Sequence, residues 1–253
     1  APLEPQPVPR EKAPVKQVVL TGDDIDLAKL PIVHHAERDS GKYITVGVLI
    51  LRDPDSGVLN AGMYRHEVQG KDKLGCMFNP THHAGYIYRR CQELNKRMEA
   101  VLFIGHHPAA LLGALGEGSI DSCELDLMGG LMGEPLAVTD AETVDLPVPA
   151  FAEIAIEGYL DPAAETADGP FAEFTGFYGP AKDPIGLMQI TAVTMRSDAI
   201  YHDLDPAHQE HNLANALSLE SAVFDSVHRL VPSVTAVYVP VSGACRFTTY
   251  VAI

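Results

Sequence analysis

The chain has 253 residues with a formal net charge of −16, and 46% of the residues are hydrophobic while 21% are charged. This composition predicts a globular protein with a sizeable core, and the excess of acidic residues argues against nucleic acid as the main partner. No apolar run reaches the roughly 18 residues that a membrane span needs. Four widely spaced cysteines without a CxxC pair indicate reduced thiols in a cytoplasmic protein.

The predicted elements begin with an arm and several strands. Residues 1–15 are rich in proline, which predicts an extended arm or linker and lacks the apolar segment of a signal peptide. Runs of β-branched residues predict strands at 16–20 and 42–53, and Pro31 limits residues 24–31 to one helical turn. Residues 53–78 are predicted as a β-meander with turns around Gly57 and Gly70.

Later segments alternate between helical and strand patterns. In chain order we predict a helix at 81–100, a strand at 100–105, helices at 108–118 and 119–133, strands at 136–140, 152–161 and 186–203, a helix at 210–232, and strands at 234–241 and 245–253. This mixture predicts an α+β fold with a largely antiparallel sheet. GxGxxG and GxxxxGK[ST] are both absent, which argues against standard dinucleotide and P-loop sites.

Two neighbouring segments carry polar residues that suggest a ligand site. On a strand, Asn60 and Arg65 would face opposite sides, so that one reaches a phosphate and the other a reacting centre; an ordinary strand with a surface arginine is the alternative. His82 and His83 stand where a helix begins, a place that favours anions. One histidine pair means little alone, but the chain also contains His34–His35 and His106–His107.

Acidic residues occur in two further places where they could hold a cation. Glu124 and Asp126 lie in an apolar run, where a buried carboxylate needs a cation or donors; exposure on one helical face is the alternative. A second cluster could bind a metal or could be a solvated loop, and it contains His202, Asp203, Asp205, His208, Glu210 and His211.

The segment DGPFAEFTG places Asp168 and Glu173 five positions apart around a Gly169–Pro170 bend. Such a bend can turn both carboxylates toward one point. Two carboxylates held close together raise the pKa of one of them, which then acts as a general acid, and an arginine between them keeps the other ionised. A polar turn without chemistry is the alternative.

Taken in order, several motifs together resemble the UbiD family of decarboxylases, which use prenylated FMN. The motifs are NAGMYR (60–65), GHHPA (105–109), CELDLMGGLMGEPL (123–136), AEIAIEGYL (152–160) and DGPFAEFTGFY (168–178). The resemblance spans nearly the whole chain, and the joint spacing is more specific than any single motif. It implies an α+β fold, with an FMN-binding split β-barrel-like domain and flanking helices.

The resemblance also implies a cofactor site. In the family, the residues that match Asn60, His83 and Glu124 hold a divalent ion, usually manganese, which bridges to the flavin phosphate, with a potassium ion nearby. An amide oxygen, an imidazole and a carboxylate suit such an ion. The full set of cofactor-binding residues that the resemblance implies is Asn60, Gly62, Met63, Arg65, His82, His83 and Glu124.

The catalytic residues implied by the resemblance are Arg65, Asp168 and Glu173, which match the Arg–Glu–Glu network of the family. Glu173 would donate the proton that replaces CO₂ on the substrate carbon, while Asp168 and Arg65 tune its acidity and Arg65 meets the substrate carboxylate. Asp168 departs from the glutamate of many members, and it shortens that arm by one methylene.

The implied activity is a reversible, non-oxidative decarboxylation of an aromatic, heteroaromatic or α,β-unsaturated carboxylic acid. A flavin prenyltransferase would supply the cofactor, and the full-length protein would be a homo-oligomer. Family members are nearly twice this length, so we predict an arm at 1–15, a prenylated-FMN-binding domain at 16–240, and at 241–253 the start of a connection to a further domain. The alternatives are a non-catalytic or truncated flavin-binding module, and a His-rich metal protein without flavin.

Overall fold

A nine-stranded sheet forms the centre of the structure, with the strand order β3-β6-β7-β14-β11-β8-β4-β5 and β2 paired to β14. The structure is a computed structural model that describes residues 1–116 and 118–253. The strands of this sheet are β2 (Val18–Thr21), β3 (Tyr43–Ile44), β4 (Val48–Arg52), β5 (Leu59–Met63), β6 (His66–Val68), β7 (Lys73–Cys76), β8 (Met98–Ile104), β11 (Ile154–Asp168) and β14 (Lys182–Met195). Every pair within it is antiparallel, as the sequence predicts.

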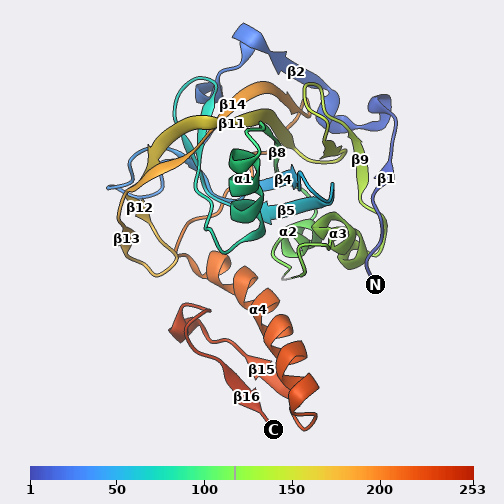
Figure 1. The fold of residues 1–253 in the computed structure, drawn as a ribbon, viewed down its shortest axis with the longest axis vertical. Coiled ribbons are helices and arrows are strands. Elements are labelled where there is room, and N and C mark those ends of the chain that lie inside the picture. Colours follow the sequence, from blue (N-terminus) through green and yellow to red (C-terminus); the bar gives the residue numbers. More distant parts are fainter. Residues whose placement is uncertain (117) are drawn as a thin grey trace.

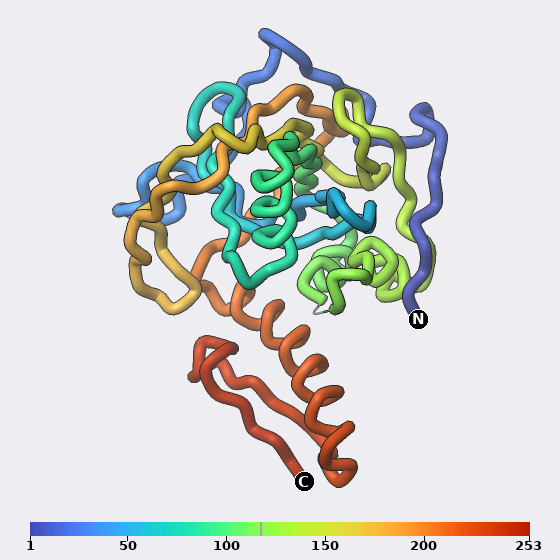
Figure 2. Tube along the Cα trace, viewed as in Figure 1, coloured from blue at the N-terminus to red at the C-terminus, as the bar shows by residue number. Residues whose placement is uncertain are grey.

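The sheet curls so strongly that its two ends approach each other. β5 lies at one end of the strand order and β6 lies next to the other end, yet only Tyr64 and Arg65 join them. Because three residue steps span at most about 10 Å, the two ends must lie close together, and the curl is visible in Figures 1 and 2. The predicted meander is therefore wrong: β4–β5 and β6–β7 are separate hairpins, since a short connection does not require neighbouring strands once a sheet closes on itself.

Four α-helices accompany the sheet among the described residues: α1 (His83–Glu93), α2 (Pro108–Ala114), α3 (Glu124–Met132) and α4 (Gln209–Leu230). The helix predicted at 81–100 is too long. Asn95 has a φ of +50°, which ends the helix, and Met98 then begins the buried strand β8. The spacing of Leu94 and Met98 therefore continues the helical period only by chance. Residue 117, in the helix predicted at 108–118, lies outside the described residues.

The core lies on both faces of the sheet, and β4 shows why. Leu49 and Leu51 pack in one hydrophobic cluster with Ile87 of α1, whereas Val48 and Ile50 pack in a second cluster with helices α2 and α3. A strand alternates its side chains between faces, so the continuous apolar run of this segment reflects burial on both sides. The run predicted as one strand at 42–53 is divided into β3 and β4, which pair with different partners.

The N-terminal segment lies against the rest of the chain. Its strand β1 (Gln6–Pro7) pairs with β9 (Ala137–Asp140), which also pairs with β10 (Pro147–Pro149). Further along, the Lys16 ammonium is buried and forms an ion pair of 3.1 Å with Glu157. The segment predicted as an arm is thus extended and docked. Short 3₁₀ turns occur at Arg10–Lys12, Pro14–Lys16, Gly22–Asp24, Leu27–Lys29 and Val241–Gly243.

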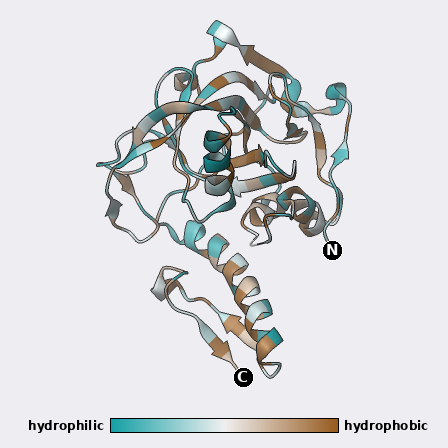
Figure 3. Cartoon of the chain, in the orientation of Figure 1, coloured by the Kyte–Doolittle hydropathy of each residue, from teal (hydrophilic) through white to brown (hydrophobic). Residues whose placement is uncertain are grey.

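The C-terminal part extends away from the curled sheet (Figure 1). It consists of α4 and a hairpin formed by β15 (Ala236–Tyr238) and β16 (Tyr250–Ala252), and Figure 3 shows many hydrophobic residues along both strands. A second small hairpin, β12 (Phe171–Ala172) with β13 (Tyr178–Gly179), carries the residues that follow Asp168. Within the described part of the chain, no helix is long and apolar enough to cross a membrane. The α+β prediction is confirmed.

Candidate active site

Arg65 lies between two carboxylates that come from distant parts of the chain. Its Nη1 donates to Oε1 of Glu173 at 2.6 Å, and its Nη2 forms a hydrogen-bonded ion pair with Oδ2 of Asp168. Arg65 stands in the connection that closes the sheet, Asp168 ends the long strand β11, and Glu173 follows β12. The structure thus brings together the three residues predicted to be catalytic.

Backbone geometry and hydrogen bonds hold this cluster. Gly169 has a φ of +83°, a conformation that favours glycine. Its N–H donates to the Tyr43 hydroxyl at 3.0 Å, so the chain turns immediately after the buried Asp168. The Glu173 N–H donates to the Phe177 carbonyl at 2.9 Å, which closes the β12–β13 hairpin. The backbone of Glu173 is therefore held by a hydrogen bond within the hairpin.

The two carboxylates differ in their access to water. The Asp168 side chain is 0% exposed, and its Oδ1 has no hydrogen-bond partner among the described residues, whereas the Glu173 side chain is 28% exposed. Burial alone would lower the pKa of Arg65, but its bonds with Asp168 and Glu173 outweigh burial and raise it. Arg65 also lies over the Phe171 ring, with Cζ 4.6 Å from the ring centroid. Of the two carboxylates that Arg65 holds, Glu173 is therefore the one that water or a ligand can reach.

A second cluster gathers Asn60, His83 and Glu124. Oε2 of Glu124 accepts hydrogen bonds from the Asn60 Nδ2 at 3.1 Å and from the Ala61 N–H at 2.8 Å. Nδ1 of His83 lies 3.3 Å from the Asn60 Nδ2 and 3.7 Å from Oε1 of Glu124. His83 begins α1 and Glu124 begins α3, so two helix N-termini meet at this cluster, a place that favours anions.

The chemistry of this second cluster fits a divalent cation. Glu124 is buried, and burial raises its pKa despite the hydrogen bonds that it accepts. The buried Oδ1 of Asn60 has no partner among the described residues. A cation would stabilise the Glu124 carboxylate, and an amide oxygen, an imidazole and a carboxylate are ligands that manganese accepts. The alternative of Glu124 as an exposed helical residue is therefore wrong.

The two clusters border two cavities that adjoin each other. A cavity of about 370 Å³ is lined by Arg65 and Glu173, and one of about 430 Å³ is lined by Asn60, His83 and Glu124. The residues that line both cavities are Met63, Tyr64, His82, Leu115, Asn215 and Arg246. Together the cavities form one elongated cleft that has Arg65 and Glu173 near one end and the candidate cation ligands near the other.

The remaining predicted cofactor-binding residues also border this cleft. Met63 and His82 line both cavities, and Gly62 lines the one beside Glu124. A Cβ atom on Gly62 would lie 2.7 Å from the Tyr64 hydroxyl, so the absence of a side chain lets the tyrosine ring lie against β5. Asn60 and Arg65 point to different clusters, but not by strand alternation, because β5 ends at Met63.

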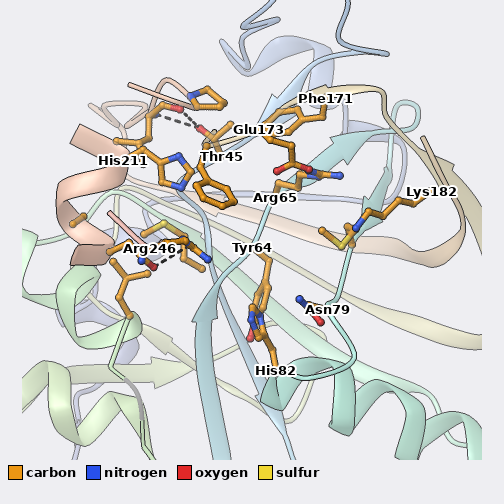
Figure 4. Close-up of a pocket in the computed structure, with 18 residues that line it drawn as sticks. Thr45, Tyr64, Arg65, Asn79, His82, Phe171, Glu173, Lys182, His211 and Arg246 are labelled. Atoms are coloured by element: carbon orange, nitrogen blue, oxygen red, sulfur yellow. Dashed lines mark hydrogen bonds and ion pairs between the residues drawn. The ribbon is translucent and has the colours of Figure 1, made fainter. Parts of the chain in front are cut away.

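Several cleft residues were not among the predicted binding residues. Figure 4 shows His211 and Arg246 on the α4 side of the cleft, with Lys182 and Asn79 across from them. His211 was named only within the acidic and histidine-rich segment, and Arg246 lies in no recognisable motif. No local pattern marks such residues, because they reach the cleft through the packing of α4 and of the segment that follows it.

The histidine-rich segments do not form a metal site in the structure. Throughout residues 1–116 and 118–253, no three His, Cys, Asp or Glu side chains are grouped to hold a metal ion. His35 is bonded to Asp203 at 2.8 Å, and His208 caps α4 by accepting from the Glu210 N–H at 3.4 Å.

Comparison with known proteins identifies the family. Residues 6–208 match the family model described as "UbiD: 3-octaprenyl-4-hydroxybenzoate carboxy-lyase Rift-related domain". The chain belongs to the UbiD family. The resemblance inferred from the sequence motifs is therefore confirmed.

Similar UbiD-class proteins agree with this assignment. The chain is 35% identical over 220 residues to the anhydromevalonate phosphate decarboxylase of Methanothermobacter thermautotrophicus, which covers 87% of this chain and 51% of that protein. An evolved dimeric form of the UbiD-class enzyme HmfF from Pelotomaculum thermopropionicum, in complex with prenylated FMN, is 38% identical with a TM-score of 0.96 over 99% of this chain and 58% of that chain.

The same fold occurs in more distant members. The apo structure of the 3,4-dihydroxybenzoic acid decarboxylase AroY from Klebsiella pneumoniae is 26% identical, with a TM-score of 0.90 over 99% of this chain and 54% of that chain. The predicted split β-barrel-like fold of UbiD-class flavin-binding domains is thus confirmed. The chain spans about half the length of the UbiD relatives that it matches.

Proposed function

We propose that this chain provides the cofactor-binding and proton-donating part of a UbiD decarboxylase that uses prenylated FMN and a divalent ion. The observation that supports this most directly is the pairing of two clusters along one cleft. One cavity is bordered by Arg65 and Glu173, and Arg65 also pairs with the buried Asp168. The adjoining cavity is bordered by Asn60, His83 and Glu124. An elongated ligand with a phosphate at one end and a reactive ring at the other suits this arrangement.

Asn60, His83 and Glu124 would hold the divalent ion, manganese or a similar metal, and this ion would draw the cofactor phosphate to the cleft. Such an ion explains how a protein with a net charge of −16 binds an anionic cofactor. Gly62, Met63 and His82 would line the cofactor. A potassium ion nearby, as the family resemblance implies, completes the proposed set of ions, and a flavin prenyltransferase would supply the prenylated cofactor.

When bound, prenylated FMN supplies the electron-accepting chemistry that allows a carbon–carbon bond to CO₂ to break. The residues of the chain orient the substrate and move the proton. Arg65 would bind the carboxylate that is lost, and Glu173, the more exposed of its two carboxylate partners, would then protonate the substrate carbon. Asp168 would hold Arg65 in place. The substrate class is an aromatic, heteroaromatic or α,β-unsaturated carboxylic acid.

The domain organisation follows from this proposal. Residues 1–15 would be a docked arm, residues 16–240 the cofactor domain, and residues 241–253 the start of a connection to a further domain of a homo-oligomeric, cytoplasmic enzyme. The alternative is a flavin-binding module without catalysis. Flavin binding without CO₂ release from any acid tested would favour that alternative.

Glu173→Gln tests the proposed role directly. The amide keeps the size of the side chain and can still accept a hydrogen bond from Arg65, but it cannot donate the proton. We expect the variant to bind flavin as the parent does and to lose at least about a hundredfold in turnover, measured as CO₂ release after co-expression with a flavin prenyltransferase. Turnover equal to that of the parent would remove Glu173 as the acid.

A further inference from the structure

The strand that leads the chain to Glu173 is very short. β12 consists of Phe171 and Ala172 alone, and one of its edges pairs with β13. A hairpin with two residues in each strand is marginally stable at best by itself in water. The position of Glu173 against Arg65 therefore depends on what holds the other edge of β12.

Residues 39 and 40 hold that other edge in place of a strand. Oδ1 of Asp39 accepts a hydrogen bond from the Ala172 N–H at 2.8 Å, and the Ser40 N–H donates to the Pro170 carbonyl at 2.9 Å. Both are backbone groups that a neighbouring strand would otherwise pair with. Because Ala172 directly precedes Glu173, the Asp39 carboxylate holds the residue next to the proposed proton donor.

The Asp39 carboxylate is itself fixed by a tight turn. Its Oδ2 accepts a hydrogen bond from the Ala36 N–H at 3.0 Å, and the Asp39 N–H donates to the Ala36 carbonyl at 3.0 Å. Asp39 is only 7% exposed, although Arg38 and Ser40 on either side of it are exposed. A buried carboxylate is costly unless its oxygens accept hydrogen bonds, and both oxygens do so here. The turn therefore presents one oxygen to β12 in a defined orientation.

The same segment also supports the face of β12. The rings of Tyr43 and Phe171 lie 4.5 Å apart between centroids, and the Tyr43 hydroxyl is hydrogen-bonded to that of Ser40 at 2.8 Å. The Phe171 ring in turn lies against the Arg65 guanidinium, at 4.6 Å from Cζ (Figure 4). Asp39 thus supplies the contact at the edge of β12, and Tyr43 supplies the contact at its face.

We propose that Asp39 is a positioning residue for the proton donor: by holding Ala172, its carboxylate sets Glu173 within hydrogen-bond distance of Arg65 at the wall of the cavity. Asp39 itself lines neither cavity, so it acts only through Glu173. A displacement of about 1 Å at a reacting group can cost roughly a hundredfold in rate, so a contact one residue away from Glu173 is close enough to affect turnover. This inference rests on the proposed function and adds a residue to it.

The test is a double-mutant cycle on turnover. CO₂ release is measured after co-expression with a flavin prenyltransferase, using cinnamate, 4-hydroxybenzoate and furan-2-carboxylate as one acid of each proposed class. We expect Asp39→Ala to lower kcat at least about tenfold in the parent. The same change should lower the residual rate of Glu173→Gln by less than about twofold, because Asp39 acts through Glu173. Asp39→Asn keeps one acceptor oxygen, so its kcat should lie between those of the parent and Asp39→Ala.

A matched control is Asp53→Ala. Asp53 is 6% exposed, and its Oδ1 also accepts hydrogen bonds from backbone N–H groups, but it lies in the turn before β5, at the other end of that strand from Arg65. This variant should keep kcat within about twofold of the parent. Amide hydrogen exchange of the flavin-free chain gives a second measurement. The amides of Ala172 and Glu173 should exchange at least about tenfold faster in Asp39→Ala and at the parent rate in Asp53→Ala.

Two results on turnover would overturn this inference and leave the decarboxylase proposal standing. One is a kcat in both Asp39 variants equal to that of Asp53→Ala. The other is an equal fold-loss from Asp39→Ala with and without Glu173, which would show a general structural effect. If Asp39→Ala does not fold, Asp39→Asn takes its place in each comparison.

Failure of the proposed function is a separate result. It is shown by a parent protein that releases CO₂ from none of the three acids, or by Glu173→Gln with the turnover of the parent. Amide exchange then decides whether Asp39 holds Glu173 in place. Unchanged exchange at Ala172 and Glu173 in both Asp39 variants overturns the inference, whereas faster exchange confined to this hairpin upholds it.

Discussion

Arg65→Met should destabilise the protein strongly, because it would leave a buried charge without its partner. The Asp168 side chain is 0% exposed, and Arg65 is its only ion-pair partner among the described residues. Methionine keeps much of the volume of the arginine stem but supplies neither charge nor donor. Glu173 is 28% exposed and can turn toward water, so its share of the loss is smaller.

The size of the effect follows from the burial of Asp168. Removing one partner of a buried ion pair costs about 3–5 kcal/mol, because the remaining charge stays desolvated. In a chain of this size each 1 kcal/mol lowers Tm by about 2–4 °C, so we expect a fall of about 10 °C. In Arg65→Met/Asp168→Asn no buried charge remains unpaired, and we expect the double variant to recover at least half of the loss.

Thermal and urea unfolding of the metal-free and flavin-free protein would measure this effect without a contribution from bound ligand. Arg97→Met is the control: its ion pair with Asp161 is on the surface, with an arginine side chain that is 61% exposed, so its loss should cost less than about 1 kcal/mol. Our account of the cluster is refuted if Arg65→Met is as stable as this control. It is also refuted if the double variant is no more stable than Arg65→Met.

Two further predictions concern the cation cluster and a buried histidine. Glu124→Gln should weaken the binding of Mn²⁺ by at least about tenfold in calorimetry, and unchanged affinity in the variant would exclude Glu124 as a ligand. Because burial raises the pKa of Glu124, the parent protein should lose Mn²⁺ on acidification at a higher pH than a site with an ordinary glutamate would. Burial lowers the pKa of His66 to about 4. Between pH 6.5 and 4 the unfolded chain therefore binds a proton that the folded chain does not, and the free energy of unfolding decreases as the pH is lowered. Lowering the pH from 7.5 to 5 should reduce the free energy of unfolding by about 2 kcal/mol through this histidine. His66→Leu should lack this contribution when urea unfolding is measured at both pH values. Identical pH dependences in the two proteins would contradict this explanation.

Much of the local structure follows from patterns within short segments. The apolar periodicity of residues 210–232 predicts α4 almost to its ends, because an amphipathic helix ending near a proline depends only on nearby residues. The glycines of the sequence also predict turns around residues 57 and 70, because glycine adopts positive φ angles readily. Both Gly57 and Gly70 have positive φ in the structure. The family and the α+β class could be inferred because several motifs recur together in order.

The site required more than local pattern. The sequence shows that Arg65, Asp168 and Glu173 are present, but Arg65 meets Asp168, more than a hundred residues later, only because the sheet closes through Tyr64 and Arg65. The helix predicted at 81–100 failed for a related reason. Tertiary burial of Met98 in β8 outweighed a helical spacing that continued past Asn95.

Arg246 shows the limit of the sequence most clearly. Its neighbours carry no motif, and its place at the cleft depends on how α4 and the following turn pack beside the curled sheet. Residue types and spacings determine which chemistry the chain can perform and which local elements it forms, because both depend on nearby atoms. Which charges share one cavity is set by contacts between distant segments, and these depend on the burial of the whole core.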